Sequence, residues 1–535
     1  MTPEAGHSQR LEPLSPALSR LSAWDWVLLT CAVAVAAPLW VGRYLPFADL
    51  PEHVAMIATL RHWWDQAWVA QHAFTLAFRN TQYLLYYVVG ALLSVVFGTA
   101  ERANLVVLTA VAVGLPYSLR SFLRAAGRDE RLAILACPFF WSMPLLIGLL
   151  NYVAALPLVI WGLAQAIRQA ERPTLGRGAG LALIGVLIFY LHLSALLFFL
   201  PASLLCFIFW PTPQATKGIA RLLAERASVL WRKLAWMIPA AALCLDWLLT
   251  SPVVRPGSIG WTETVEVEFQ APQVALAQLP EALLDIWRGN ASRWPIVVWL
   301  VALALIAWPT RQRRLDWVAR WQKAGMGSIV SLAMVLYFSM PFVIGWLWWI
   351  NARYAILAAL LLPALAPAPR GTRGLLSLSL GAAIALWVAT TAAVHVRAFQ
   401  REATGFEPVL AHARPGRRLF SMIFEQRSDV ARFIPYHHFG SYYRALFGGI
   451  AEPSFANLPQ SPVRYRPEMA PPPRAPDWEW DPTTFRNELD GEYYDYVLVR
   501  GKVDLFAPKP PGPTWRLAAR EGRWALFEKA SAPTW

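Results

Sequence analysis

Long apolar runs recur along residues 24–395 of the chain, and short polar segments rich in arginine separate them. A run of roughly 18 or more apolar residues has the length of a helix that crosses a bilayer. The pattern therefore predicts a mainly α-helical membrane bundle with about 11 spans. We expect the spans at residues 24–43, 103–119, 132–149, 153–167, 179–191, 194–211, 235–250, 294–309, 327–349, 354–368 and 374–395.

Residues 81–98 are also apolar enough to cross a membrane. Counting them as a span would place the basic segment 120–131 on the outer side. We therefore expect an interfacial or re-entrant helix on the outer face, where Tyr83, Tyr86 and Tyr87 suit the level of the lipid headgroups.

Residues 179–211 form one apolar run that is interrupted only by the turn at residues 190–194. A single span would move one of the two flanking basic segments, 168–177 or 217–233, to the outer side. Two short spans keep both segments inside and are therefore expected.

The basic residues between the spans also set the orientation. With the N-terminus inside, most Lys and Arg residues of the connecting segments face the cytosol. An odd number of spans then places the C-terminus outside. Residues 1–23 become a polar cytoplasmic lead, and the first span is expected to be a retained anchor because no small-residue cleavage site follows it. We expect an integral protein of the bacterial inner (cytoplasmic) membrane.

The predicted transmembrane domain covers residues 24–395 and includes an outer loop with juxtamembrane helices at residues 45–100. A larger outer loop at residues 251–293 carries an acidic strip. Alternation over residues 262–269 predicts a short, solvated strand in this loop. The acidic strip consists of Glu263, Glu266 and Glu268.

From residue 396 the chain becomes polar, proline-rich and aromatic, which predicts a small extracytoplasmic α/β domain over residues 396–535. Residues 492–500 are typical of a strand, and residues 515–519 and 524–528 of a hairpin. Residues 452–482 contain many prolines and are expected to form an extended lid or linker.

The composition excludes an ordinary soluble protein, because 56% of residues are hydrophobic and only 15% are charged. The net charge of +14 does not indicate nucleic acid, since the basic residues lie between apolar segments, where anionic lipid attracts them. No disulfide or metal-ligand spacing is visible, so neither a metal nor a cofactor is expected. All four cysteines lie in apolar segments: Cys31, Cys137, Cys206 and Cys244.

Candidate chemistry begins directly after the first span, in the stretch from Tyr44 to His53. Asp49, Glu52 and His53 have the spacing i, i+3 and i+4, which is one face of a helix. Carboxyl and imidazole groups at a membrane surface are candidates for proton transfer. The same residues, with Pro51 in the first turn, are also a capping-box pattern, and capping and catalysis can coexist.

Further ionisable residues are expected at the outer ends of later spans, namely His192, Asp246, Arg353 and His395. A transporter would place such groups near the midplane, on broken helices in paired halves. Each residue also has a structural interpretation: a turn for His192, a loop ion pair for Asp246, an interface for His395 and snorkelling for Arg353. Arg353 next to aromatic residues also suits a lipid-linked phosphate.

A polar and aromatic cluster lies in the predicted outer domain. His437 and His438 are adjacent, with Tyr436, Tyr442 and Tyr443 beside them. The cluster is typical of either an aromatic platform for a sugar or an ordinary domain core.

The order of these parts resembles the GT-C class of polytopic glycosyltransferases, such as the protein mannosyltransferases and aminoarabinose transferases. The resemblance covers most of residues 24–395. It rests on the acidic motif Asp49-Leu-Pro-Glu52, the helix at 81–98, the polar turn Tyr190-Leu-His192 and the late segment Asn351-Ala-Arg353-Tyr.

The resemblance implies transfer of a sugar from a polyprenyl-phosphate donor to an unknown acceptor at the extracytoplasmic face. Asp49 corresponds to the acidic residue that acts as general base. Arg353 is expected to hold the donor phosphate, and Glu52 or His53 to orient Asp49. His192 and Asp246 are also expected to bind substrate.

The chain departs from the family pattern at two points. Leu50 and Pro51 separate acidic residues that are often adjacent in the family. The second outer loop has Asn151 and Tyr152, which we expect to contact substrate, where the family often has a further acid. Two other classes stay open, a lipid-linked saccharide transporter and a non-catalytic membrane assembly protein.

Overall fold

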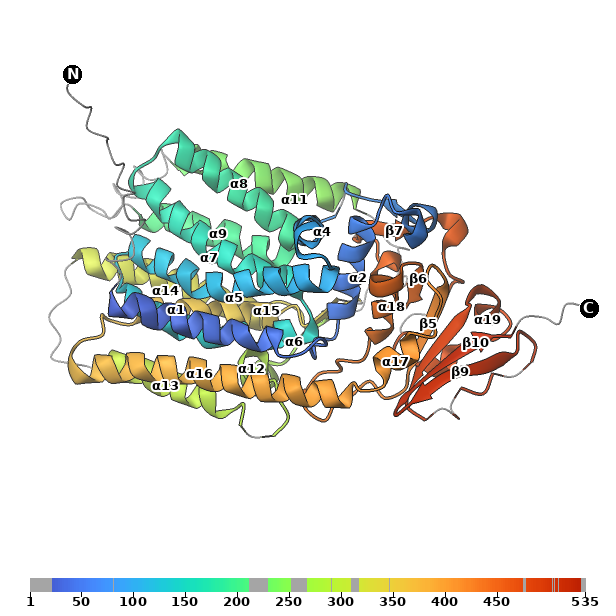
Figure 1. The fold of residues 1–535 in the computed structure, drawn as a ribbon. Helices are drawn as coiled ribbons and strands as arrows, with labels where there is room; N and C mark the ends of the chain where they lie inside the picture. Colours follow the sequence, from blue (N-terminus) through green and yellow to red (C-terminus); the bar gives the residue numbers. More distant parts are fainter. Residues whose placement is uncertain are drawn as a thin grey trace, which may run out of the picture.

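The structure is a computed structural model. It describes residues 22–79, 81–210, 230–251, 267–289, 291–308, 317–345, 347–474, 478–502, 504, 506–508 and 510–530. The described part is a helical bundle with a smaller domain built on a sheet at one end (Figure 1).

Each of the expected spans overlaps a helical segment, because a backbone surrounded by lipid must satisfy its hydrogen bonds internally. Figure 1 shows these helices side by side. They are α1 (Ala23–Ala36) with η2 (Ala37–Trp40), α5 (Ala100–Ala125), η4 (Glu130–Phe140) with α6 (Met143–Ile147), α7 (Leu150–Glu171), α8 (Leu175–Leu191), α9 (Leu193–Phe209), η5 (Ala235–Met237) with α11 (Ile238–Thr250), α13 (Trp294–Ala307), α14 (Trp317–Ser339), α15 (Ala352–Leu361) with η7 (Leu362–Leu365), and α16 (Gly371–Glu402).

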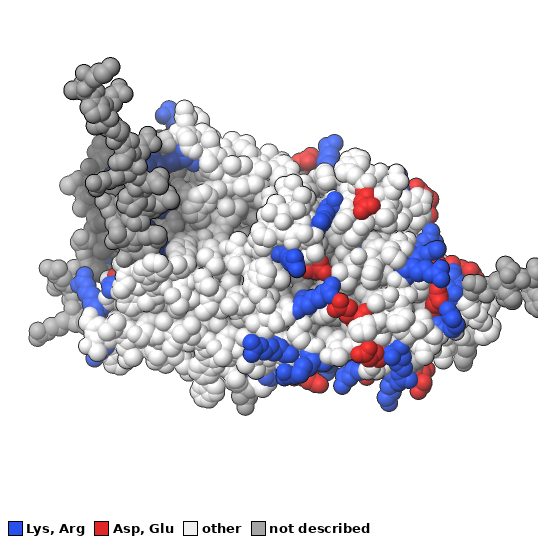
Figure 2. Space-filling view, in the orientation of Figure 1, with Lys and Arg blue, Asp and Glu red and all other residues white. Residues whose placement is uncertain are grey.

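Six helical segments among the described residues are long and apolar enough to cross a membrane, and the bundle contains further, shorter apolar helices. On the face shown in Figure 2, the side of the bundle carries few charged residues, whereas Lys, Arg, Asp and Glu gather over the C-terminal domain. The chain is therefore an integral membrane protein. The number of crossings and the orientation remain predictions.

The expected span at residues 327–349 differs from the observed helix. α14 begins ten residues earlier and ends at Ser339. Pro341 follows, and its missing N–H and fixed φ oppose continuation of the helix. The chain then forms the short strands β3 (Val343–Ile344) and β4 (Leu347–Trp348). β3 pairs with both β4 and β2 (Val267–Glu268).

The segments predicted as outer loops contain short helices. α2 (Leu50–Arg61) follows the first span, and α4 (Leu84–Phe97) packs between α2 and α5. In the larger loop predicted at residues 251–293, α12 (Pro272–Leu283) follows β2. Glu263 and Glu266, with most of the expected strand at 262–269, lie outside the described residues.

The C-terminal domain holds a five-stranded mixed sheet in the order β6-β5-β8-β10-β9. The central strand β8 runs parallel to β5 and antiparallel to β10. The predicted hairpin is confirmed as β9 and β10. The predicted strand at 492–500 is correct only in its second half, because its first residues form the short helix α19 (Asp490–Tyr493). The strands are β5 (Arg418–Ile423), β6 (Ile450–Glu452), β8 (Tyr496–Arg500), β9 (Trp515–Glu521) and β10 (Trp524–Lys529).

Residues 452–482 do not form a free linker in their described part. β7 (Val463–Tyr465) pairs antiparallel with β1 (Phe74–Leu76) of the first outer loop. Nearby, η8 (Phe439–Ser441) and α18 (Tyr442–Phe447) pack against α2. The C-terminal domain is therefore docked on the first outer loop at two places, and the candidate site lies between them and the bundle.

Candidate functional site

The backbone around Asp49 is fixed by the turn between α6 and α7. The amides of Ala48 and Asp49 donate to the carbonyls of Leu146 and Ile147, at 3.0 and 3.1 Å. Gly148 in this turn has φ +97°, and a Cβ atom there would lie only 2.6 Å from the Asp49 nitrogen. Only glycine permits this close approach, and the two backbone hydrogen bonds then hold Asp49 at the start of α2.

The Asp49 side chain does not cap α2. Asp49 occupies the N-cap position, yet its carboxylate accepts no hydrogen bond from the first turn of the helix. Instead, Oδ1 lies 2.9 Å from Nδ1 of His438, an imidazole of the C-terminal domain. The capping-box interpretation is therefore wrong for this motif. The carboxylate is 21% exposed and faces a cavity.

His438 is held in a charged environment. Burial opposes its protonation, but the carboxylates of Asp49 and Glu479 outweigh this effect and raise the pKa of His438 to about 10. Asp49 consequently faces a cationic partner at neutral pH.

His53 contacts the turn at Gly148 that holds Asp49 in place. Its Nε2 lies 2.7 Å from the Gly148 carbonyl, and its Nδ1 lies 2.9 Å from the hydroxyl of Tyr87. Burial lowers the pKa of His53, so the ring is neutral, with Nε2–H donating to Gly148. Asn151 donates to the same tyrosine hydroxyl at 3.5 Å, and both His53 and Asn151 line the cavity.

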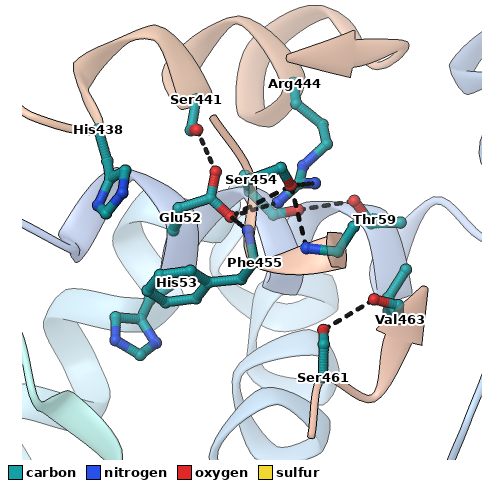
Figure 3. Close-up of polar contacts among 12 residues, drawn as sticks. Glu52, His53, Thr59, His438, Ser441, Arg444, Ser454, Phe455, Ser461 and Val463 are labelled. Atoms are coloured by element: carbon teal, nitrogen blue, oxygen red, sulfur yellow. Dashed lines mark hydrogen bonds and ion pairs between the residues drawn. The ribbon is translucent and has the colours of Figure 1, made fainter. Parts of the chain in front are cut away.

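Glu52 points away from the cavity and into the interface with the C-terminal domain (Figure 3). Its side chain is 0% exposed and pairs with Arg444, whose Nη2 lies 3.0 Å away. The amide of Phe455 donates to the same carboxylate at 2.8 Å, and the Ser441 hydroxyl donates to its other oxygen. Glu52 therefore docks the domain on α2 and does not contact Asp49 through its side chain.

The cavity lies between the loops at one end of the bundle and the C-terminal domain, with a volume of about 240 Å³. Five of the residues predicted from the sequence line it: Asp49, His53, Asn151, His192 and Arg353. They come from four separate segments of the chain. The structure thus brings together the residues that the sequence placed on one side of the membrane.

Arg353 lies in the first turn of α15 and is 5% exposed, so it does not snorkel to solvent. Nη1 donates to the Ser194 hydroxyl at 3.0 Å and Nη2 to the Trp348 carbonyl at 3.1 Å. Its Nε has no hydrogen-bond partner, and no described carboxylate lies within ion-pair distance. Tyr152 donates to the Arg353 carbonyl and so positions the backbone and not the guanidinium.

His192 has both a structural and a cavity-facing role. It caps α9, where its Nδ1 accepts from the Ser194 amide at 3.1 Å, as the turn interpretation predicts. The ring packs against those of Tyr83 and Tyr152, with centroids 5.3 Å away in each case. The same imidazole lines the cavity.

Two predicted residues do not reach this site. Asp246 is exposed on α11, beside the exposed side chains of Leu245 and Leu249, and does not line the cavity. His395 stacks on Trp287 at 4.8 Å, elsewhere on the bundle. Both lie near span ends as expected, but on helix faces that do not line the cavity. A hydrophobic run does not specify how a helix is rotated about its axis, so the sequence could not predict this.

The outer-domain cluster divides into two environments. Tyr436 and Tyr442 pack with Phe439 in the domain core, as the core interpretation predicts. His437 and His438 instead line the cavity, together with Glu479 and Trp480. The His-His pair is visible in the sequence, but no spacing signal connects it to a glutamate about 40 residues later.

No protein-family model matches the chain, and no curated protein matches it. Three solved structures are similar to it. ArnT from Cupriavidus metallidurans, bound to undecaprenyl phosphate, shares 13% identity over 96% of this chain and 99% of its own, with a TM-score of 0.44. The arabinofuranosyltransferase AftD from Mycobacteria shares 14% over 96% of this chain, with a TM-score of 0.48, and this chain spans 40% of its length. The Archaeoglobus fulgidus oligosaccharyltransferase in its apo form shares 12% over 90% of this chain and 70% of its own, with a TM-score of 0.43.

Proposed function

We propose that this chain is a membrane glycosyltransferase of the GT-C type. It moves a sugar from a polyprenyl-phosphate donor to an acceptor at the extracytoplasmic face of the bacterial inner membrane. The observation that carries the proposal is the placement of Asp49 and Arg353 in the walls of one cavity. A carboxylate that can accept a proton and a guanidinium that lacks an anion thus face the same space.

Arg353 provides the argument for a phosphate. Burying an unpaired charge is costly, and proteins usually pair such a charge or use it to bind a ligand. A lipid phosphate would accept hydrogen bonds from the guanidinium in place of the carboxylate that the described chain does not supply. The neighbouring Tyr83 and His192 are not cationic groups, so Arg353 is the residue of the three that would bind the phosphate.

Asp49 provides the base. In the proposed step, the acceptor hydroxyl gives its proton to Asp49, and the acceptor oxygen forms a bond to the anomeric carbon of the sugar. The bond between that carbon and the donor phosphate oxygen breaks, and the electron pair leaves with the lipid phosphate beside Arg353. The leaving group is already a phosphate, so this transfer requires no cofactor.

The aromatic rim of the cavity suits a sugar ring. Trp348 and Trp480 stack with ring centroids 5.6 Å apart and are 48% and 38% exposed. The exposed parts of both indoles line the cavity and offer an apolar surface to the C–H face of a sugar. Trp348 belongs to the outer hairpin after α14 and Trp480 to the C-terminal domain, so the platform spans both domains.

The test is to incubate the purified protein with a panel of polyprenyl-phosphate sugars and candidate acceptors, and to detect covalent product by mass spectrometry. Release of free polyprenyl phosphate together with a glycosylated acceptor is expected. Accumulation of donor inside proteoliposomes without a covalent product would instead show a transporter. Absence of both, with a stable complex of other envelope proteins, would show an assembly protein.

A further inference from the structure

The side of the cavity formed by the C-terminal domain carries a second set of polar groups. Nε2 of His437 lies 3.9 Å from Oε1 of Glu479, and Nε2 of His438 lies 3.8 Å from Oε2 of the same carboxylate. One ligand atom from each of these three residues lies within 4.8 Å of the others. None of these contacts between the glutamate and the imidazoles is short enough to be a hydrogen bond.

Ion pairing does not explain the buried environment of His437. It is 3% exposed, and neither of its ring nitrogens has a hydrogen-bond partner among the residues that the structure describes. Its ring stacks on Trp480 with centroids 4.2 Å apart, so its orientation is defined by packing. A buried imidazole without partners is unfavourable unless a ligand completes it. An ion pair between His438 and two carboxylates accounts for His438 alone.

We propose that His437, His438 and Glu479 bind a divalent transition-metal ion of the zinc type, with a fourth position open to the cavity. Nitrogen and oxygen ligands of tetrahedral zinc are about 3.4 Å apart, given metal–ligand distances of about 2.0–2.2 Å. The observed separations of 3.8 and 3.9 Å reach this value with small side-chain rotations. Two imidazoles and one carboxylate suit zinc, whereas magnesium and calcium prefer oxygen ligands.

The surroundings are those of a metal centre. Nδ1–H of His438 donates to the Asp49 carboxylate at 2.9 Å, and binding of the ion would release the proton on Nε2, which then becomes a ligand. Such carboxylate–histidine–metal arrangements fix the ring orientation and increase the basicity of the ligand. The edge of Phe455 covers the His438 ring with centroids 5.5 Å apart, so an aromatic shell limits access of solvent. The metal would thus hold His438, and through it Asp49, in place.

The test uses the purified full-length chain with a tag that contains no histidines. The protein is stripped with EDTA, loaded with Zn²⁺ or Co²⁺ and desalted. Metal content is then measured by mass spectrometry, and the Co²⁺ form by its visible ligand-field spectrum. About one ion per chain is expected, with the intense bands of four- or five-coordinate cobalt. These readouts require no sugar transfer, so the metal site and the proposed function can fail independently.

Variants identify the ligands. His437→Ala and Glu479→Gln should abolish stoichiometric binding, and Asp49→Asn should weaken it by about 10- to 100-fold. His412→Ala removes an exposed imidazole of the same domain and should retain the ion. His437→Gln repeats the first test with less disturbance of the packing on Trp480. Equal metal retention in His437→Ala, His437→Gln and His412→Ala, or no retention by the unaltered chain, would overturn the proposal.

Discussion

Asp49 and Glu52 lie in the first turn of one helix, and both contact the C-terminal domain, but their environments are opposite. Asp49 is 21% exposed, lines the cavity and faces an imidazole that can exchange protons. Glu52 is 0% exposed and pairs with the guanidinium of Arg444. Two carboxylates only three positions apart therefore differ: one is available to a ligand, and the other is enclosed in an interface.

The two carboxylates therefore have different roles: Asp49 is available for chemistry, and Glu52 positions the C-terminal domain. Every hydrogen bond to the Glu52 carboxylate comes from the C-terminal domain, from α18, the Phe455 amide and nearby hydroxyls. Glu52 is fully buried and does not line the cavity, so its carboxylate is not accessible to a substrate. Asp49 instead keeps an oxygen at the cavity, which is the geometry that proton transfer requires. Glu52 determines where the domain lies, and that placement brings His438 to Asp49.

The strongest test of this difference is Asp49→Asn. The amide has nearly the shape of the carboxylate but cannot accept the acceptor proton, so transfer should fall by about 10²- to 10⁴-fold. The melting temperature should fall less than in Glu52→Ala, because the amide oxygen can still accept a hydrogen bond from Nδ1–H of His438 and Asp49 makes no capping bond. Product formation in single-turnover assays and thermal unfolding would measure the two effects. Full activity in this variant would show that Asp49 is not the general base.

Glu52→Ala should act in the opposite way, on stability. Removing one member of a buried ion pair leaves Arg444 uncompensated, and such changes cost about 3–5 kcal/mol. We expect a lower unfolding temperature, together with faster proteolysis of the C-terminal domain. The double variant Glu52→Gln with Arg444→Met removes both charges and should recover much of the loss. If Glu52→Ala unfolds like the unaltered chain, the docking role is wrong.

Sequence reasoning succeeded where the signal is local. The hydrophobic runs predicted the helices of the bundle. The distribution of Lys and Arg between the runs predicted that Asp49, His192 and Arg353 lie at the same end of the bundle, and all three line one cavity. It also predicted the β9–β10 hairpin, whose strands are separated by a two-residue turn. These features depend on periodicity, turn residues and the membrane, all of which act on neighbouring positions.

It failed where partners lie far apart in the chain. The pairing of Glu52 with Arg444, separated by 392 positions, has no local pattern, so the sequence left a capping box and a catalytic motif as equal alternatives. The same is true of the β1–β7 pair and of Glu479 beside the two histidines. The rotation of α11, which turns Asp246 outward, depends on packing with neighbouring helices and is not encoded in a uniformly apolar run.

Arg353→Lys tests the opposite wall of the cavity. Lysine keeps the charge but loses the planar fork that can bind a phosphate through two parallel hydrogen bonds. We expect the KM for the lipid donor to increase by about 10- to 100-fold, with a smaller effect on the KM for the acceptor. Tyr354→Phe is the matched control, because it changes a neighbouring buried group without altering charge. An unchanged donor KM in Arg353→Lys would place the phosphate elsewhere.

The smallest expected effect concerns Glu452, a third buried carboxyl group close to Glu52. It accepts hydrogen bonds from Tyr465 at 2.5 Å and Asn457 at 2.8 Å, but it forms no ion pair with a described residue. Burial, with a contribution from the charge of Glu52, raises the pKa of Glu452 to about 8. The folded chain therefore keeps a proton that the unfolded chain has lost at neutral pH.

The sign of the pH dependence follows from that difference. Between the unfolded pKa of 4.5 and the folded pKa of about 8, the folded state binds more protons, so stability falls as pH rises. Between about pH 6 and 7.5 the loss should be about 2 kcal/mol, at about 1.4 kcal/mol per pH unit. Glu452→Gln cannot ionise and should remove this slope, whereas Glu52→Gln should leave a slope from Glu452. Thermal unfolding of both variants at several pH values would decide, because a slope that persists in Glu452→Gln must belong to another group.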